Sequence, residues 1–467
     1  MTLERQTKPN LVPIRWTFDM ISISFVIYRI KLVHKFNALS IQPFSEELLK
    51  MYFRKFLIST LLIGVATGHM PNTELSGDSV HFSLHKLSEA VNTFGFNLFS
   101  SMRRIGTSSN VCLCPVSLVN VLSILHYGAR GETEKELSKV LFFNDYNLTS
   151  TEAAEAFYKL QTELLVSSNH NHYFFNASAT ILIDEHSNVL QSFQRTVEVL
   201  FQIPLTVVNF KDSAQRTVES INTWVAERTR IKILEIIDKI DESADMIVLN
   251  AAYFKGRWVH TFSPSDTTYK FFYNYGSRSH LKKFSIFRKV PMMSLTKRLR
   301  CYFTHDYSIL EIPIRGRNLS MVIYLPSTKE GLFNVENILF PEVFWDNMNL
   351  LHRRQVKVTL PRFNFEFHGN LTENLLHLGA KTLFDSHSVN LSGMMSRKRV
   401  IFRDVQHKAF LSVSEGGIDA MPPRNSISHK IFAEKYDILF EVDHPFIFFI
   451  YDKRLSMILF MGHITEV

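Results

Sequence analysis

The feature that most constrains the fold of this chain is the pattern of residues 405–467 at its C-terminal end. Alternating positions in Ala409–Ser414 predict a strand, and the glycines of Glu415–Gly417 end that pattern. A long polar segment follows, and the dense apolar runs His444–Tyr451 and Ser456–Met461 then predict two paired strands. The tail therefore places an exposed loop between strands that hold both of its ends, and loops of this kind usually carry function.

A second marker of organisation lies near the N-terminus. Two basic residues, an apolar stretch over 56–66 and the small-residue pattern Ala66-Thr67-Gly68 form the layout of a secretory signal peptide. A cytoplasmic tail with an anchor is the alternative, but the apolar stretch is too short to cross a bilayer. We therefore predict an upstream extension that is disordered or not in the mature protein (1–50), a signal peptide (51–68) and a single domain (69–467).

Charge and motifs narrow the class of function. Residues 1–50 hold 7 basic and 4 acidic groups and residues 51–68 hold 2 basic ones, so their removal reduces the formal charge from +8 to +3. Nucleic-acid binding thereby loses most of its support. The chain has no G-x-S-x-G, H-E-x-x-H or P-loop motif, so we expect no enzyme activity, no catalytic residues, no metal and no cofactor.

The cysteines predict a protein whose stability comes from its core, and the glycosylation motifs fit a secreted one. Cys112, Cys114 and Cys301 are too few for a disulfide framework and are predicted to be buried free thiols. The 46% hydrophobic content is sufficient for a large core. Five Asn-x-Ser/Thr motifs fit a secreted glycoprotein, of which we expect two or three to be used: Asn147, Asn176, Asn318, Asn370 and Asn390.

Helical patterns come early in the chain and strand patterns late, which predicts an α+β fold. The helical segments are 83–102, 116–127, 132–141, 152–166 and 214–228. The strand segments are 177–183, 246–254, 308–314, 320–325 and 356–366. Residues 275–289 are basic without clean periodicity and form either a solvated loop or a site for a polyanion such as heparin, through Arg278, Lys282, Lys283, Arg288 and Lys289.

Several short segments, in a fixed order, resemble one family. They are NVCLCPVS (110–117), GARGETEKELSKVL (128–141), INTWVAERTRIKI (221–233), LNAAYFKGRW (249–258), VPMM (290–293), LPRF (360–363) and DHPFIFF (443–449). Together they resemble the serpins, the serine protease inhibitors, and the resemblance extends from about residue 85 to the end.

The resemblance implies a fold and a mechanism. Serpins pack helices around a five-stranded central sheet A, with two smaller sheets and an exposed reactive-centre loop, here about residues 415–440. A protease that cuts the loop becomes acylated, and the freed segment inserts into sheet A as a new strand. By the same resemblance, Ser117, Asn250 and His407 form a polar cluster where the sheet opens, and Trp258 lies where the loop enters.

The segment after the hinge departs from the family pattern. It consists of Glu415, Gly416, Gly417, Ile418, Asp419, Ala420, Met421, Pro422, Pro423 and Arg424. If Ala420 faces inward on a strand, Ile418, Pro422 and Arg424 do so as well. Prolines lack the N–H that a central strand donates, and a buried arginine is costly unless it is paired.

Efficient trapping is therefore in question. A non-inhibitory serpin that acts as a carrier, chaperone or binding protein is the alternative, and a degenerate gene product is a third hypothesis. The family spacing from Glu415 puts the reactive bond at Ile431–Phe432, with Lys430 and Lys435 as other candidates. We expect a secreted monomer that meets an extracellular serine protease, trypsin-like or elastase-like, and neither a membrane nor a nucleic acid.

Overall fold

The computed structural model describes residues 77–104, 109–168, 172–211, 214–274, 287–316, 319–396, 399–421 and 435–467. All of them belong to one compact unit, Leu75–Val467. Several predicted features lie outside the described residues: the extension and signal peptide, Asn318, Arg278, Lys282, Lys283, and the loop positions Pro422, Pro423, Arg424, Lys430, Ile431 and Phe432.

The five predicted helical segments all form helices, because each places its apolar residues on the side that faces the core. None of the helices among the described residues has the length and apolar character needed to span a membrane. The helices are α3 (Gly77–Arg104), α4 (Pro115–Gly128), α5 (Glu132–Val140), α6 (Ser150–Ser168), α7 (Gln191–Thr196), α8 (Ala214–Arg228), α9 (Leu332–Ile338), α10 (Pro341–Leu350) and α11 (Thr372–Leu378).

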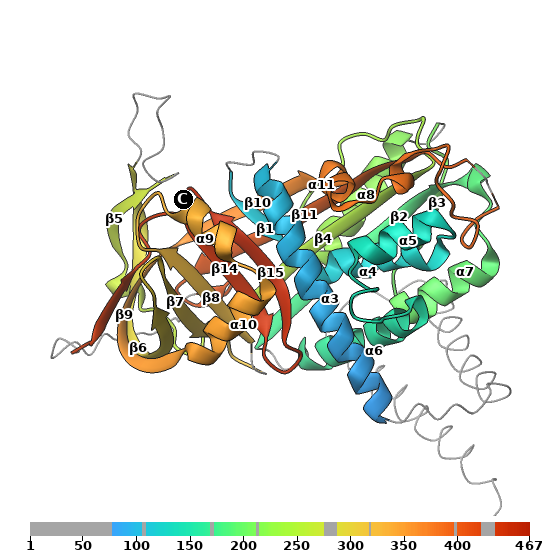
Figure 1. Cartoon of the computed structure of the whole chain (residues 1–467). Coiled ribbons are helices and arrows are strands. Elements are labelled where there is room, and N and C mark those ends of the chain that lie inside the picture. The colour runs from blue at the N-terminus through green and yellow to red at the C-terminus, as the bar shows by residue number, and fades with distance from the viewer. Residues whose placement is uncertain are drawn as a thin grey trace, which may run out of the picture. The chain divides into compact units, whose positions relative to one another are not determined.

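A six-stranded sheet, called the central sheet below, forms the centre of one half of the molecule (Figure 1). Its order is β10 (Phe363–Asn370), β11 (Phe402–Ser414), β12 (Gly417–Ile418), β4 (Met246–Arg257), β2 (Tyr173–Asp184) and β3 (Leu205–Val208). Five of these strands are the predicted sheet A, and β12 is a two-residue addition from the hinge. β11 also pairs directly with β4, in parallel, along most of their shared length.

The remaining strands form a second, nine-stranded sheet. Its order is β1 (Val111–Leu113), β15 (Met457–Ile464), β14 (Phe446–Asp452), β8 (Leu319–Pro326), β7 (Tyr307–Pro313), β6 (Phe287–Phe303), β9 (His352–Pro361) and β13 (Ile438–Glu441), with β5 (Thr268–Tyr273) also paired to β6. The long strand β6 thus joins into one sheet what the resemblance implied as two smaller sheets.

Two details of the strand prediction were wrong. Residues 356–366 were expected to be one strand, but the chain leaves β9 at Pro361 and enters β10 at Phe363 in the other sheet. The backbone N–H of Arg362 donates to the carbonyl of Pro291 at 2.8 Å, so the residue at which the chain passes from one sheet to the other keeps its backbone hydrogen bond. Strand β6 was not predicted, because Pro291 and its many basic residues obscure the alternation of apolar positions.

Helical layers cover both faces of the central sheet. On one face, Ile247, Leu249 and Ala251 of β4 pack in a small core with Val218 and Val225 of α8. The opposite face of β4 belongs to the main core of the molecule, together with residues of α3, α4 and α6. Because both faces are covered, β4 is buried along nearly its whole length.

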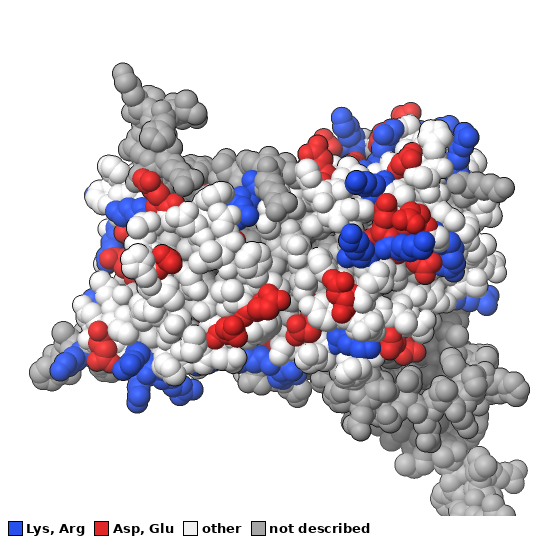
Figure 2. Space-filling view, in the orientation of Figure 1, with Lys and Arg blue, Asp and Glu red and all other residues white. Residues whose placement is uncertain are grey.

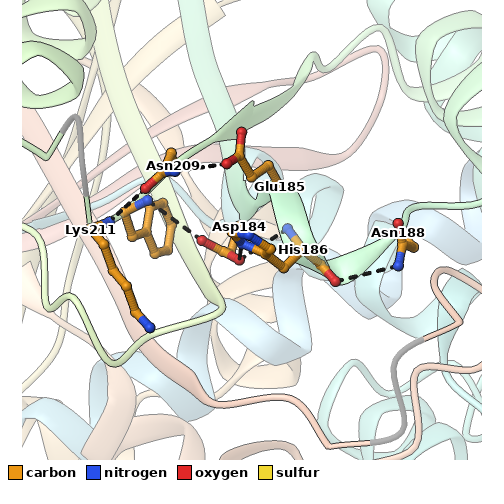
Figure 3. A network of polar contacts seen from close by, with 7 residues as sticks. Asp184, Glu185, His186, Asn188, Asn209 and Lys211 are labelled. Carbon is orange, nitrogen blue, oxygen red and sulfur yellow. Dashed lines mark hydrogen bonds and ion pairs between the residues drawn. The ribbon is translucent and has the colours of Figure 1, made fainter.

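The end of β2 farthest from the hinge is tied to the end of β3 by a polar network (Figure 3). The carboxylate of Asp184 accepts hydrogen bonds from the backbone N–H and the ring Nδ1 of His186, each at 3.0 Å, and from the backbone N–H of Phe210 at 3.5 Å. Asn209 donates to the side chain of Glu185 at 2.7 Å. These contacts fasten the edge strand β3 at the base of the sheet.

Candidate functional site

A buried hydrogen-bonded cluster joins β4, β11 and α4 in the middle of the central sheet. Asn250 and His407 lie directly opposite each other in the parallel register. The side-chain amide of Asn250 donates to Ser117 Oγ at 2.5 Å, and His407 Nδ1 lies 2.8 Å from Asn250 Oδ1. His407 Nε2 accepts the backbone N–H of Cys114 at 3.3 Å, so Nδ1 carries the ring proton. The structure thus brings together the three residues predicted for sheet opening.

Burial sets the protonation state of this cluster. His407 is completely buried, and its desolvation lowers the pKa of the imidazole to about 3, so the ring is neutral at physiological pH. Burial also raises the pKa of the neighbouring Cys114 thiol to about 12. Cys112, Cys114 and Cys301 are all buried free thiols, as predicted. The cluster therefore holds β4 against β11 through neutral hydrogen bonds alone.

Trp258 anchors the start of the loop at one end of the sheet. Its side chain is completely buried, and its indole N–H donates to the carbonyl of Ser414 at 3.0 Å. Its backbone N–H donates to the carbonyl of Gly416 at 3.1 Å, and that of Phe262 donates to the carbonyl of Glu415 at 3.0 Å. The turn that follows β11 is therefore hydrogen-bonded to the segment after β4, which places Trp258 at the point of loop entry.

The carboxylate of Glu415 is almost fully buried at this end of the sheet, with 2% of its side chain exposed. One oxygen, Oε1, accepts a hydrogen bond from Thr267 Oγ1 at 2.9 Å and lies 3.4 Å from Arg362 Nη1. The other oxygen, Oε2, is buried and has no hydrogen-bond partner among the described residues. Thr267 and Arg362 were not assigned to the site from the sequence, because neither lies near Glu415 along the chain.

The two residues of β12 lie between the ends of β11 and β4 and pair antiparallel with both. A Cβ atom on Gly417 would lie 2.0 Å from the carbonyl oxygen of Gly256, so only glycine fits there. Ile418 is completely buried in the main core and Ala420 is 5% exposed, so these two side chains face inward. The hinge is thus already inserted by two residues in the intact chain.

The other predicted site residues lie apart from this cluster. Lys435 is exposed just before β13, and Arg288 and Lys289 are exposed on β6. Met421 is exposed and ends the described part of the hinge. Of the glycosylation motifs, Asn176 is half-buried and donates to the carbonyl of Arg228 at 2.7 Å. The other described ones, Asn147, Asn370 and Asn390, are exposed.

A two-residue strand between two strands of a central sheet, beside a hydrogen-bonded cluster that joins them, is an arrangement suited to the addition of a strand. Comparison with known proteins shows the class to which the chain belongs. The chain belongs to the serpin family: the family model described as Serpin (serine protease inhibitor) matches residues 89–467. Members of this family are generally protease inhibitors and not enzymes.

Related proteins come from several animals. The chain is 32% identical to "Intracellular coagulation inhibitor 2" of Tachypleus tridentatus, over 82% of this chain and 92% of that protein. It is 31% identical to "Iripin-2" of Ixodes ricinus, over 82% and 94%. Both similarities cover nearly all of the described part of the chain.

Solved structures confirm the predicted fold. Serpin48 of Tenebrio molitor has a TM-score of 0.68 and 26% identity, covering 86% of this chain and all of that one. Uncleaved ovalbumin has a TM-score of 0.72 and 26% identity, and native protease nexin-1 with heparin has 0.71 and 25%. These two cover 82% and 83% of this chain and all of their own.

Proposed function

We propose that this protein is a secreted inhibitor that presents residues 415–440 to an extracellular serine protease of trypsin-like or elastase-like specificity. The observation that carries the proposal is the position of β12 between β11 and β4. Once the loop is cut, the residues that follow can extend β12 along the same two strands. The exposed Lys435 and the segment before it offer the protease a cleavage site.

Insertion requires the chain to separate β11 from β4 and to fill the space between them. The hydrogen bond between His407 of β11 and Asn250 of β4 must break for this separation, and the incoming backbone replaces the direct pairing of the two strands. Ile418 and Ala420 are already buried at this end of the sheet. Pro422, Pro423 and Arg424 oppose the next steps, because two N–H groups are missing and a cation would be buried. We therefore infer slow insertion.

Incubation with trypsin-like and elastase-like proteases tests this proposal. An inhibitor gives a covalent complex that survives detergent, and the clipped chain melts at a higher temperature than the intact one. Replacing Pro422, Pro423 and Arg424 together by alanine should raise the trapped fraction. Clipping without a complex and without a gain in heat resistance favours the alternative, a non-inhibitory serpin that acts as a carrier, chaperone or binding protein.

Secretion is the second part of the proposal, supported by the signal-peptide pattern at 51–68 and by three exposed glycosylation motifs, Asn147, Asn370 and Asn390. Expression in animal cells tests it. A secreted protein appears in the medium, and an N-glycosidase reduces its apparent mass, whereas replacing these three asparagines by glutamine removes that shift. Protein that stays in the cell without glycans contradicts the proposal.

A polyanion such as heparin is a second candidate partner, and the observation that favours it is a basic ribbon on β6 and β9, formed by Lys297, Arg298, Arg353, Arg354 and Lys357. Lys and Arg side chains gather in Figure 2 where β6 and β9 are labelled in Figure 1. Arg298, Arg353 and Arg354 are exposed, and no carboxylate among the described residues pairs with them.

The register of the two strands places Arg298, Arg353 and Lys357 on one face of the sheet and Lys297 and Arg354 on the other, because side chains alternate along a strand. Arg353 lies directly opposite Arg300, whose charge is paired with Glu311 at 2.8 Å. Arg353 therefore faces a charge that is already paired, and its own charge stays available to an anionic ligand. Parallel pairing of β9 with β13 also brings the ribbon beside the end of the loop, where Lys357 lies 5.3 Å from the ring of Tyr436.

Salt elution from immobilised heparin distinguishes the basic ribbon from the segment predicted by sequence. We expect the triple variant Arg298→Gln, Arg353→Gln, Arg354→Gln to elute at a lower salt concentration than the wild type, because each lost phosphate- or sulfate-type contact reduces the salt dependence. The matched variant Arg288→Gln, Lys289→Gln should elute near the wild type. If only the second variant elutes at a lower salt concentration, the heparin site lies at the start of β6. If neither variant changes its elution, the polyanion proposal is wrong.

A further inference from the structure

The residue that ends β12 has an unusual conformation and a dense set of contacts. Asp419 has a φ of 44°, in the left-handed region that disfavours most side chains. Its backbone N–H donates to the carbonyl of Ser412 at 2.6 Å, which continues the pairing with β11. Its carboxylate accepts a hydrogen bond from the hydroxyl of Tyr253 and forms an ion pair with Lys232 at 2.9 Å. The strand therefore stops at a residue that is held on three sides.

The partners of Asp419 belong to elements outside the loop. Tyr253 lies on the face of β4 that α8 covers, and Lys232 lies in the connection between α8 and β4. The side chain of Asp419 is 14% exposed and that of Lys232 is 35% exposed, so the ion pair is largely shielded from water. These contacts connect the hinge to the layer that must yield when the sheet opens.

The connection itself is fastened to the sheet by cations above aromatic rings. The guanidinium of Arg230 lies 3.8 Å from the ring centre of Phe174 on β2, and the Lys232 amine lies 5.4 Å from that of Phe410 on β11. The rings of Phe174 and Phe410 lie 5.8 Å and 6.4 Å from that of Tyr253. Three neighbouring strands thus carry an aromatic row, and the connection crosses it to reach Asp419.

Further insertion would break these contacts. In the register of β12 on β4, Gly417 lies opposite Arg257 and Ile418 opposite Gly256, so the next residue on an extended strand would lie opposite Lys255. Asp419 must therefore leave the left-handed conformation and exchange Tyr253 and Lys232 for a new neighbour. This exchange is the first step after the inserted pair, before Pro422 is reached.

We propose that Asp419 is a positioning residue that arrests the loop after two residues of insertion, through its contacts with Tyr253 and Lys232, and so sets the rate at which the loop is taken up by the sheet. This inference rests on the proposed function, because it concerns the same insertion. It adds a specific barrier that lies before the two prolines. A chain without this barrier should insert faster, whereas its bait sequence and its encounter with a protease stay the same.

The test compares loop uptake with protease encounter in the full chain. Loop uptake is measured by incubating the intact chain at elevated temperature and following the fraction of molecules whose loop a metalloprotease can still cut. Protease encounter is measured as the second-order rate constant for the reaction with trypsin. We expect Asp419→Asn to raise the uptake rate about tenfold, equivalent to about 1.4 kcal/mol, with little change in encounter. The number of inhibitor molecules consumed per trapped protease should fall.

Partner and control variants separate arrest from general loosening. Lys232→Met should accelerate uptake as well, and adding Asp419→Asn to it should give less than the product of the two effects. Asp419→Glu retains the charge and should restore uptake to near the wild-type rate. Lys239→Met, an exposed lysine in the same connection, should leave uptake unchanged.

The outcomes distinguish this inference from the proposed function. Uptake at the wild-type rate in Asp419→Asn and Lys232→Met, in a chain that does take up its loop, overturns the role of Asp419. Equal acceleration by Lys239→Met also overturns it, because the effect would then be non-specific. If no variant takes up its loop, insertion itself is wrong and both proposals fall. Uptake in Asp419→Asn but not in the wild type supports both.

Discussion

Acid is expected to weaken the central sheet through His407, because this histidine is buried in its neutral form. Its pKa is about 3 in the folded chain, compared with about 6.5 for an unperturbed histidine. Between these values the unfolded chain binds a proton that the folded chain does not, so stability falls as the pH is lowered from 7 toward 3. At pH 5 the gap to the unfolded pKa is about 1.5 units, which corresponds to about 2 kcal/mol for this one residue.

Urea unfolding at pH 7.5 and 5.0, followed by tryptophan fluorescence, measures this contribution. Between pH 7.5 and pH 5.0, we expect the free energy of unfolding of His407→Gln to fall by about 2 kcal/mol less than that of the wild type. At pH 7.5 the variant should be less stable by about 1–3 kcal/mol, because Asn250 and the Cys114 N–H lose well-placed partners. The two effects have opposite signs, so they can be separated in one data set.

Another buried histidine serves as a comparison. Burial and the charge of Arg130 lower the pKa of His126 to about 4, so His126→Gln should also reduce the pH dependence by about 2 kcal/mol. A pH dependence in His407→Gln equal to that of the wild type would refute the reasoning, since it would mean that His407 is protonated in the folded chain.

Two further substitutions test the packing of the sheets. Glu311 is 2% exposed and forms ion pairs with Arg300 and Lys453. Burial alone would raise the pKa of its carboxyl group, but the hydrogen bonds and charges of its partners outweigh burial, so the pKa is lowered. Glu311→Gln should therefore cost about 2–4 kcal/mol in urea unfolding at pH 7 and progressively less as the pH falls below the ordinary glutamate value of 4.5, and an equal cost at neutral and acid pH would contradict the ion pairs. Gly417→Ala should expel β12, because the new methyl would overlap the Gly256 carbonyl; unchanged tryptophan fluorescence and clipping rate would show that the hinge tolerates it.

The sequence was informative wherever a local pattern determines the structure. The helices α3 to α6 and α8 followed from the spacing of apolar residues, and β4 from its nearly continuous apolar run. It was least informative at Arg362, where the chain changes sheets without a turn residue, and along β6, where Pro291 and basic residues on both faces obscure the alternation. Both errors occur where tertiary pairing, and not local composition, decides the structure.

For the candidate site too, motifs in the sequence predicted some residues, and only the tertiary structure identified the others. Ser117, Asn250, His407 and Trp258 were found through the family motifs; the structure joins the first three by hydrogen bonds and bonds Trp258 separately to Ser414. The residues that contact the carboxylates of Glu415 and Asp419 were not predicted, because they lie in elements far away in the sequence. A charged residue two positions after the hinge glycines was the only available signal for Asp419, and it did not indicate a partner.

The parallel pairing of β11 with β4 has a consequence for the energy of the whole molecule. Parallel ladders have slanted hydrogen bonds and are slightly weaker per residue than antiparallel ones. A strand arriving between them in the direction of β12 would replace one such ladder by two antiparallel ladders. On the proposed function, the intact molecule is therefore the less bonded of the two arrangements, and a cut in the loop opens the path to the other.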